Sequence, residues 1–213
     1  DEGTSLVEVV VASTVGAIAL AAVYSLMWGF TDDVSVATDL ANAQRDTRPV
    51  IQAIVIELRQ ATPGSPTAAG DPVETLSNTS ITFHSDRWDP VGPERITYSL
   101  ESCASGLCDL RRRVLSADTS STAPDWTYAD GDVVLDFVVA EGVVDPATSG
   151  QALFAGIEYV AGSPVVTSTC DAPGGTACDF PLVAVDLQID PNGLRDNPRV
   201  YEIYEEVRMR NAS

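Results

Sequence analysis

A long apolar run lies near the beginning of the chain. Residues 6–30 are apolar or small almost throughout, and Glu8 is the one charged side chain among them. A helix needs about 20 such residues to cross the hydrocarbon core of a bilayer. Tyr24, Trp28 and Phe30 lie at the far end of the run, where an interfacial aromatic belt would fall. The pattern therefore predicts a membrane-spanning helix. A cleaved secretory signal is the alternative, but its apolar part is usually about 7–15 residues long and ends at a small-x-small site.

The pattern changes to an amphipathic one after residue 30. Apolar or small side chains recur at intervals of three or four, which is typical of a helix with one packed face. These are Leu40, Ala43, Thr47, Ile51, Ile54, Leu58 and Ala61. Polar side chains fall largely elsewhere and predict a solvated face: Asp39, Asn42, Asp46, Gln52, Glu57 and Gln60. Pro49 should bend or briefly interrupt this helix because it lacks a backbone donor. Pro63, Gly64 and Pro66 should end it.

The rest of the chain predicts strands. The candidate segments are residues 79–85, 95–101, 110–115, 133–140, 153–160, 182–189 and 200–209. In the first of them Ile81 and Phe83 alternate with Thr82 and His84, which indicates a sheet with one buried and one solvated face. The βαβ rhythm of a parallel doubly wound sheet is missing. We therefore predict an α+β fold: a long N-terminal helix, with a membrane-spanning half and an amphipathic half, packed on a largely antiparallel β-sheet head.

Size and charge narrow the class of protein. The 213 residues suit one ordinary domain with an appendage. The net charge is −19, and all 12 basic residues are arginines. An acidic surface of this kind repels phosphate backbones, so we expect no nucleic-acid partner. The run from Arg111 to Arg113 is accordingly interpreted as a strand with alternating outward charges.

Four cysteines form two close pairs, Cys103 with Cys108 and Cys170 with Cys178. Three pairings are possible. Neighbour pairing is favoured because each short segment contains glycine that can turn the chain back. Zinc is the competing interpretation, but it would call for a tighter Cys-x-x-Cys spacing and usually for histidine. Two local disulfides would place the head in an oxidising compartment.

The sequence contains no recognisable catalytic set. His84 is the single histidine, and we expect it to be a surface residue because no nucleophile motif accompanies it. We predict neither enzyme activity nor a cofactor. Asp190, Asn192 and Asp196 are weak candidates for calcium because they offer oxygen ligands on a glycine-bearing loop. They do not match the twelve-residue calcium loop.

Glu8 is the unusual residue of the apolar run. A carboxylate within a membrane helix is costly unless it reaches the headgroups or meets a cation, so both interpretations stand on the residue alone. Residues 3–12 read Gly-Thr-Ser-Leu-Val-Glu-Val-Val-Val-Ala. This stretch resembles the processing motif of type IV prepilins and type II secretion pseudopilins. The chain also resembles, more loosely, the larger minor pilins and minor pseudopilins at residues 43–61, 81–83, 95–100, 110–114 and 207–211.

The resemblance implies a role for three residues. A prepilin peptidase would cut after Gly3, Thr4 would become the methylated N-terminus, and Glu8 would be the acid that such subunits carry near their start. The amine of Thr4 in a neighbouring subunit would then neutralise Glu8 and set the register between subunits. One departure from the family pattern is Thr, rather than Phe or Met, at position 4. The basic leader of the family is not in the sequence, so we expect this sequence to begin downstream of the true start.

The resemblance also implies an organisation and partners. Residues 1–3 would be a leader remnant, 4–30 the transmembrane and filament-core helix, 31–62 its amphipathic half, and 63–213 the globular head. The chain would be a minor pilin or pseudopilin that starts or caps a filament of a type IV pilus or a type II secretion system. Its partners would be other pilins, the prepilin peptidase and the inner-membrane assembly platform. It would lie in the cytoplasmic membrane before assembly and in a cell-surface filament afterwards. The alternative is a solitary membrane-anchored extracellular binding domain.

Overall fold

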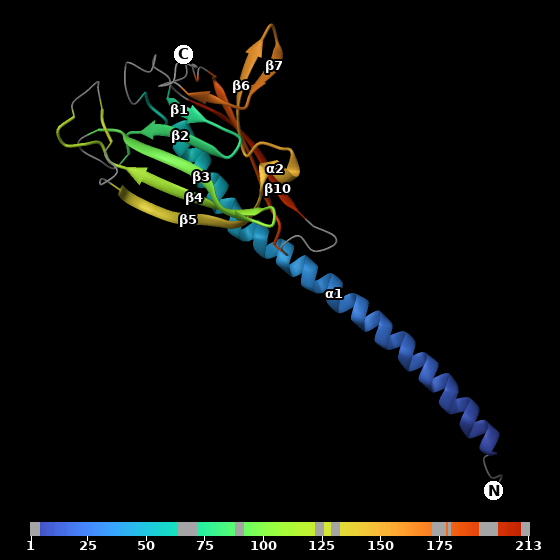
Figure 1. The fold of residues 1–213 in the computed structure, drawn as a ribbon. Coiled ribbons are helices and arrows are strands. Elements are labelled where there is room, and N and C mark those ends of the chain that lie inside the picture. The colour runs from blue at the N-terminus through green and yellow to red at the C-terminus, as the bar shows by residue number, and fades with distance from the viewer. Residues whose placement is uncertain are drawn as a thin grey trace. The chain divides into compact units, whose positions relative to one another are not determined.

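The structure, a computed structural model, describes residues 5–63, 72–87, 92–121, 126–128, 133–171, 178, 180–191 and 200–209. It consists of one long helix, a short second helix and an antiparallel sheet (Figure 1), which is an α+β fold, as predicted. The chain divides into two compact units, Asp1–Asn42 and Ala43–Ser213. The last part of the long helix therefore belongs to the same unit as the sheet.

Helix α1 spans Leu6–Arg59. Its helical assignment continues through Pro49, so of the bend or brief interruption expected there the interruption does not occur. Thr47 and Ile51, on either side of the proline, are both buried, and this packing holds the helix where the missing donor weakens it. After Arg59 the chain turns, and Ala61 forms an isolated bridge to Ser85.

The strands of the described residues form one sheet in which every pairing is antiparallel. Their bounds are β1 Val73–Leu76, β2 Ser80–Ser85, β3 Glu94–Ala104, β4 Leu107–Leu115, β5 Val133–Val144, β6 Phe154–Val160, β7 Ser163–Thr167, β8 Cys170–Asp171, β9 Leu182–Ile189 and β10 Tyr201–Arg208. The order is β7-β6-β9-β5-β4-β3-β2-β1-β8, and β10 pairs with β9. Strands β5 and β9 meet only at the pair Val143 and Ile189. Along most of β5 the one strand partner among the described residues is therefore β4, and the other side of β5 has none.

All seven predicted strands are confirmed. The sequence missed β1, β7 and β8, which are four, five and two residues long, and the four-residue helix α2 Pro146–Ser149. Short strands give too few alternating positions to recognise, and Pro164 inside β7 argues against a strand unless it lies at an edge. Strand β7 is in fact at the end of the strand order.

The hydrophobic core joins the second part of α1 to the sheet. Ile51, Ile54 and Leu58 lie fully buried against inward-facing residues of the sheet, as the spacing of three and four predicts. The partners in the same cluster include Ile81, Phe83, Ile96, Tyr98, Leu110, Val114, Val183, Val185 and Leu187. Glu57 contradicts the predicted solvated face, because it is buried as well.

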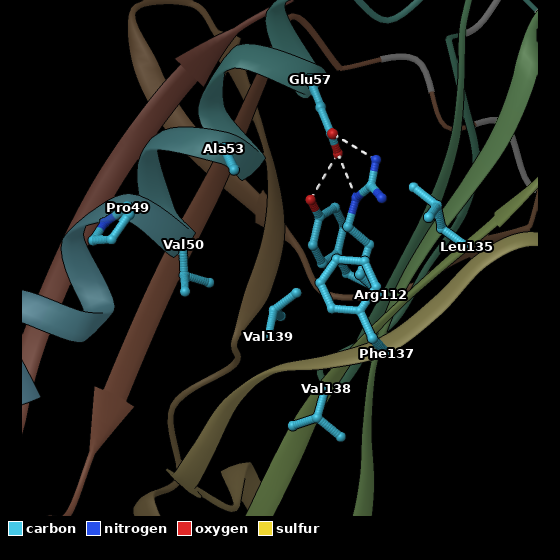
Figure 2. Close-up of a pocket in the computed structure, with 10 residues that line it drawn as sticks. Pro49, Val50, Ala53, Glu57, Arg112, Leu135, Phe137, Val138 and Val139 are labelled. Carbon is cyan, nitrogen blue, oxygen red and sulfur yellow. Dashed lines mark hydrogen bonds and ion pairs between the residues drawn. The ribbon is translucent and has the colours of Figure 1, made fainter. Parts of the chain in front are cut away.

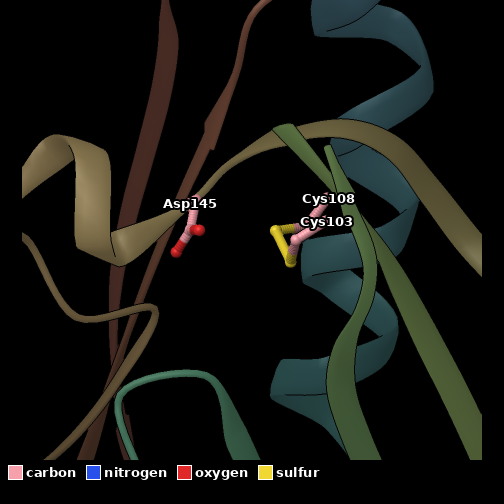
Figure 3. A group of neighbouring side chains, drawn as sticks. All are labelled: Cys103, Cys108 and Asp145. Carbon is pink, nitrogen blue, oxygen red and sulfur yellow. A yellow bond between two sulfur atoms is a disulfide. The ribbon is translucent and has the colours of Figure 1, made fainter. Parts of the chain in front are cut away.

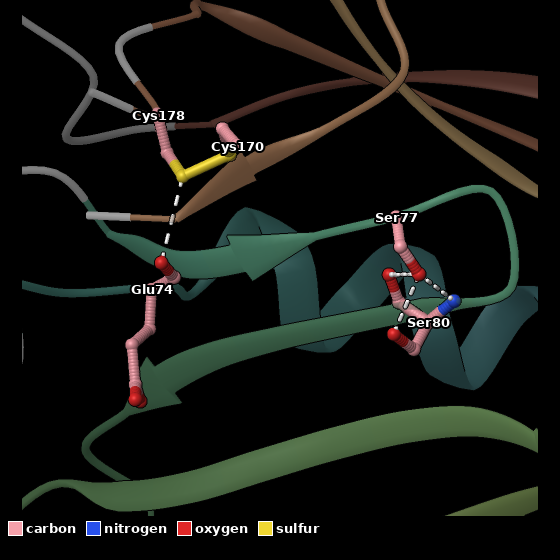
Figure 4. Close-up of a disulfide and its surroundings, with 5 residues drawn as sticks. All are labelled: Glu74, Ser77, Ser80, Cys170 and Cys178. Atoms are coloured by element: carbon pink, nitrogen blue, oxygen red, sulfur yellow. Dashed lines mark hydrogen bonds between the residues drawn. A yellow bond between two sulfur atoms is a disulfide. The ribbon is translucent and has the colours of Figure 1, made fainter. Parts of the chain in front are cut away.

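Both disulfides are formed between neighbours in the sequence. Cys103 and Cys108 are joined across the turn between β3 and β4. Cys170 and Cys178 are joined beside β1, and the Sγ of Cys178 lies 3.5 Å from the carbonyl oxygen of Glu74 (Figure 4). In the same figure the turn from β1 to β2 is closed by the Ser80 amide, which donates to Ser77 Oγ at 3.0 Å.

Candidate functional site

The first part of α1 is an apolar surface that no other described residue of the chain buries. Its large apolar side chains from Leu6 to Phe30 are between 53% and 80% exposed. The most apolar 18-residue window has a mean hydropathy of 2.3, and none of it is buried. By length and composition this helix could cross a membrane.

Hydroxyl groups within this apolar stretch are satisfied by the helix itself. Ser13 and Thr14 both donate to the carbonyl oxygen of Val10, at 2.9 and 2.8 Å. Thr31 donates to the carbonyl of Met27 at 2.7 Å. A hydroxyl bonded to its own backbone needs no water, so these residues add little to the cost of placing the helix in an apolar medium.

Glu8 lies in the first turn of α1, and its side chain is exposed. Its amide donates to the carbonyl oxygen of Ser5 at 3.0 Å and to Ser5 Oγ at 3.3 Å, which begins the helix. A carboxylate at this end is favoured by the helix dipole. None of the ion pairs among the described residues involves Glu8. Gly3 and Thr4 lie outside the described residues, so the processing site stays a prediction.

A second feature is a groove of about 460 Å³ on the head, between α1 and β5 (Figure 2). Its walls are apolar on both sides. They consist of Pro49, Val50 and Ala53 from α1 and Leu135, Phe137, Val138 and Val139 from β5. Phe137 is 46% exposed and Val138 is 41% exposed, so the β5 wall is open to solvent. Cavities of this size and lining are typical of sites that receive apolar groups.

The floor of the groove holds three polar side chains, Glu57, Tyr98 and Arg112, which we call the Glu57 cluster. The hydroxyl of Tyr98 donates to Glu57 Oε2 at 2.6 Å. Arg112 donates from Nε to Glu57 Oε2 at 3.2 Å and from Nη2 to Glu57 Oε1 at 2.7 Å. The guanidinium also lies 6.0 Å from the centre of the Phe137 ring. Figure 2 shows this two-pronged contact between the helix and β4.

Burial and charge shape the titration of this cluster. Burial, together with the charge of Glu57 and the hydrogen bond to it, raises the pKa of Tyr98 far above its usual range. Burial opposes the charge on Arg112, but its hydrogen bonds and charge interaction with Glu57 raise its pKa overall. Arg112 therefore keeps its charge and Tyr98 its proton at physiological pH, and the cluster is a structural group in which both donors meet the carboxylate of Glu57.

The sequence missed this cluster, although a signal for it existed. Leu110 and Val114 are buried in β4, and strict alternation puts Arg112 on the same face. The arginine run therefore alternates along a strand as expected, and the sequence missed only the partner of the inward Arg112. A buried guanidinium requires a buried carboxylate, and Glu57 lies between Ile54 and Leu58 on the packed part of α1.

His84 is not the surface residue that we expected. It is 7% exposed, and its Nε2 lies 3.5 Å from Glu74 Oε2. The ring of Tyr128 covers it, with centroids 5.3 Å apart, and Arg95 donates to both oxygens of Glu74 at 2.7 Å. Burial lowers the pKa of His84 to about 4, although Glu74 opposes the shift. Both faces of β2 are covered, so the predicted solvated face is wrong for this strand.

The metal candidates divide between two places. Asp190 is buried, and its amide donates to the carbonyl of Gly142 at 3.0 Å, while Asn192 and Asp196 lie outside the described residues. The one group of metal-ligand type in the described part of the chain is Cys103, Cys108 and Asp145 (Figure 3). Its two sulfurs are bonded to each other, so they are not thiolates. Asp145 caps α2 by accepting from the amide of Ala147 at 2.9 Å. This group is structural.

Comparison with known proteins assigns no family to the chain. No protein-family model matches it, and no curated protein matches it.

Proposed function

We propose that the chain is a structural subunit of a type IV pilus-like or type II secretion-like filament, of the minor pilin or pseudopilin kind. The observation that carries the proposal is the first part of α1. It is apolar on all sides, long enough for a bilayer, and has a single acid, Glu8, in its first turn. Such a helix serves equally as an anchor in lipid and as the centre of a bundle of identical helices.

The exposed carboxylate of Glu8 gives the helix bundle a fixed register. In an apolar bundle an unpaired carboxylate is costly, and a cationic amine from a neighbouring subunit would offset that cost. The proposed amine is the N-terminus left at Thr4 after a prepilin peptidase cuts behind Gly3. Subunits shifted along the axis would leave both charges unpaired, so the pair selects one arrangement.

The test is filament incorporation of Glu8→Gln in cells that express the full chain. Gln keeps the size and polarity but cannot pair with an amine as a charge, so we expect filaments to lose most of this subunit. Ser13→Ala is the matched control, because Ser13 lies in the same apolar stretch and its hydroxyl bonds only within the helix. The amount of subunit in sheared filaments, measured against the amount in membranes, is the readout. Equal incorporation of Glu8→Gln and Ser13→Ala would contradict the proposal.

The proposal includes partners and a location. They are other pilin-like subunits, the prepilin peptidase and the inner-membrane assembly platform, first in the cytoplasmic membrane and then in a filament at the cell surface. A second candidate function is a solitary membrane-anchored binding domain, and the open groove between α1 and β5 favours it. Two results together would support the second candidate: substitutions at the groove that alter ligand capture by the head, and a chain that does not enter filaments.

A further inference from the structure

The hairpin of β6 and β7 exposes apolar side chains on both of its faces. Tyr159, Val160, Val165 and Val166 are 45% to 64% exposed. The register pairs Glu158 with Val165 and Ile157 with Val166, so Val165 and Val166 point to opposite faces. Figure 1 shows the hairpin standing away from β5. A two-stranded hairpin that exposes apolar side chains to water is only marginally stable, and burying those side chains against a partner would stabilise it.

The end of the hairpin is also free of charge. Residues 159–167 read Tyr-Val-Ala-Gly-Ser-Pro-Val-Val-Thr, in a chain whose net charge is −19. Exposed edge strands usually carry charged side chains that prevent association, and this edge has none. Pro164 removes one backbone donor from β7, which makes β7 a poor template for an added strand. The contact that the hairpin offers is therefore made by its side chains.

The groove between α1 and β5 has matching properties. Its open β5 wall is apolar, and the charges on its floor are already paired within the Glu57 cluster. Asp136, the one charged side chain between Val133 and Ala140, is held by Arg111. Two copies of so acidic a chain repel each other over most of their surfaces. They can approach where neither surface carries a free charge. The groove is one such surface, and the hairpin face of Tyr159 and Val166 is another, because the exposed Glu158 lies on the opposite face beside Val165.

We propose that the β6–β7 hairpin of one copy docks its apolar side chains in the groove between α1 and β5 of the next copy. This inference rests on the proposed function, because it names the contact between heads in the filament. The two surfaces differ, so the contact is heterologous and leaves a free hairpin at one end and a free groove at the other. A contact of this kind forms an open filament unless its rotation closes a ring, so it is compatible with the proposed filament.

The chain contains no lysine, which allows a direct test by amine crosslinking. One preparation of the full chain carries Ser163→Lys at the start of β7, next to the turn of the hairpin, and another carries Val134→Lys on β5, one residue before Leu135 of the groove wall. The two are mixed in membranes and treated with a short amine-reactive crosslinker. The control pairs Thr148→Lys, exposed on α2, with Val134→Lys. The unsubstituted chain measures the background from its terminal amine.

We expect the hairpin and groove pair to crosslink about tenfold more than the control pair, because docking fixes the two amines close together. Adding Val138→Glu to the copy with the substituted groove should remove this excess, because it places an unpaired charge in the contact. Val138→Leu should keep it. Equal crosslinking of the two pairs, or an excess that survives Val138→Glu, would overturn the inference. If filaments form but this crosslink does not, the docking inference is contradicted and the proposed function is not. If the crosslink forms but the chain does not enter filaments, the proposed function is contradicted and the docking contact is not.

Discussion

At the scale of single residues, the head is organised by buried polar groups whose partners come from distant segments. Glu57 of α1 meets Tyr98 of β3 and Arg112 of β4, and His84 of β2 meets Glu74 of β1 and Tyr128. A buried polar group is tolerated when its partners are in place and is costly when one is removed. These groups therefore specify how α1 and the strands fit together, in addition to the apolar core.

The Glu57 cluster gives the first residue-scale prediction. Glu57→Leu leaves Arg112 buried without its carboxylate and should lower the free energy of unfolding by about 3–5 kcal/mol. Arg112→Leu should cost a similar amount. The double substitution leaves no buried charge, so it should be more stable than either single variant. Chemical denaturation of the full chain followed by circular dichroism measures the cycle.

Gln52→Leu is the control for this cycle, because Gln52 is exposed on the same helix. It should change the free energy of unfolding by less than about 0.5 kcal/mol. If the costs of the single substitutions simply add in the double variant, Glu57 and Arg112 are not coupled and the cluster has been misjudged.

His84 gives a prediction of pH dependence. Its pKa falls from an ordinary 6.5 to about 4 in the folded head, so the unfolded chain binds a proton between these values and the folded chain does not. The stability that neutral His84 contributes is present above pH 6.5 and is lost as the pH falls toward 4. The loss should reach about 3 kcal/mol, since one unit of pKa corresponds to about 1.4 kcal/mol. Burial and the charge of Glu202 raise the pKa of Asp186 to about 6, which works in the opposite direction over a similar range.

Comparison with His84→Gln isolates the histidine, because the contribution of Asp186 is common to both proteins. Stability measured by denaturation at several pH values should fall more steeply toward pH 4 in the unsubstituted chain than in His84→Gln. Parallel curves would show that His84 is not buried as a neutral group.

The sequence could predict the faces of these elements but not the polar exceptions on them. Ile51, Ile54 and Leu58 follow the helical period and are buried as expected. The polarity of Glu57 alone predicts a solvated position. Alternation in β4 places Arg112 inward, and this buried charge was the signal that a carboxylate such as Glu57 must be buried as well. His84 could not be placed, because Tyr128, which covers it, comes from a segment far along the chain that carries no pattern of its own.

At the scale of elements, a very short strand needs a covalent link to hold its position, whereas a long element is held by the regular burial of its apolar side chains. The two-residue strand β8 pairs with β1 through Leu76 and Cys170, and the Cys170–Cys178 disulfide holds it there. Periodicity cannot reveal such a strand. The Cys103–Cys108 disulfide, in contrast, closes a turn between β3 and β4, which already pair along most of their length.

This difference predicts unequal effects of removing the two disulfides. Replacing Cys170 and Cys178 together by Ala should cost more than the loop-entropy value of about 2–3 kcal/mol, because β8 also loses its support on β1. Replacing Cys103 and Cys108 together should cost that value or less, since the β3–β4 ladder keeps the turn closed. Thermal unfolding of both variants measures the order. A larger loss for the Cys103 and Cys108 variant would contradict this account.

At the scale of the whole molecule, the described part of this acidic, lysine-free chain has two kinds of largely apolar surface, and Glu8 is the one acid within the first of them. One is the apolar first part of α1, and the other is the pair formed by the β6–β7 hairpin and the groove on the head. Like-charge repulsion disfavours contact elsewhere, so assembly of identical copies should concentrate at these surfaces. The proposed filament uses both, through the helices for cohesion and the heads for order along its length.

Mass spectrometry of the N-terminus of this protein, recovered from filaments sheared off the cell surface, tests the central claim most directly. We predict a polypeptide that begins with Thr4 and carries a methyl group on its amine, because processing behind Gly3 creates the cation that Glu8 needs. Protein that still carries residues 1–3, or that is found in membranes but not in the sheared fraction, would contradict the account.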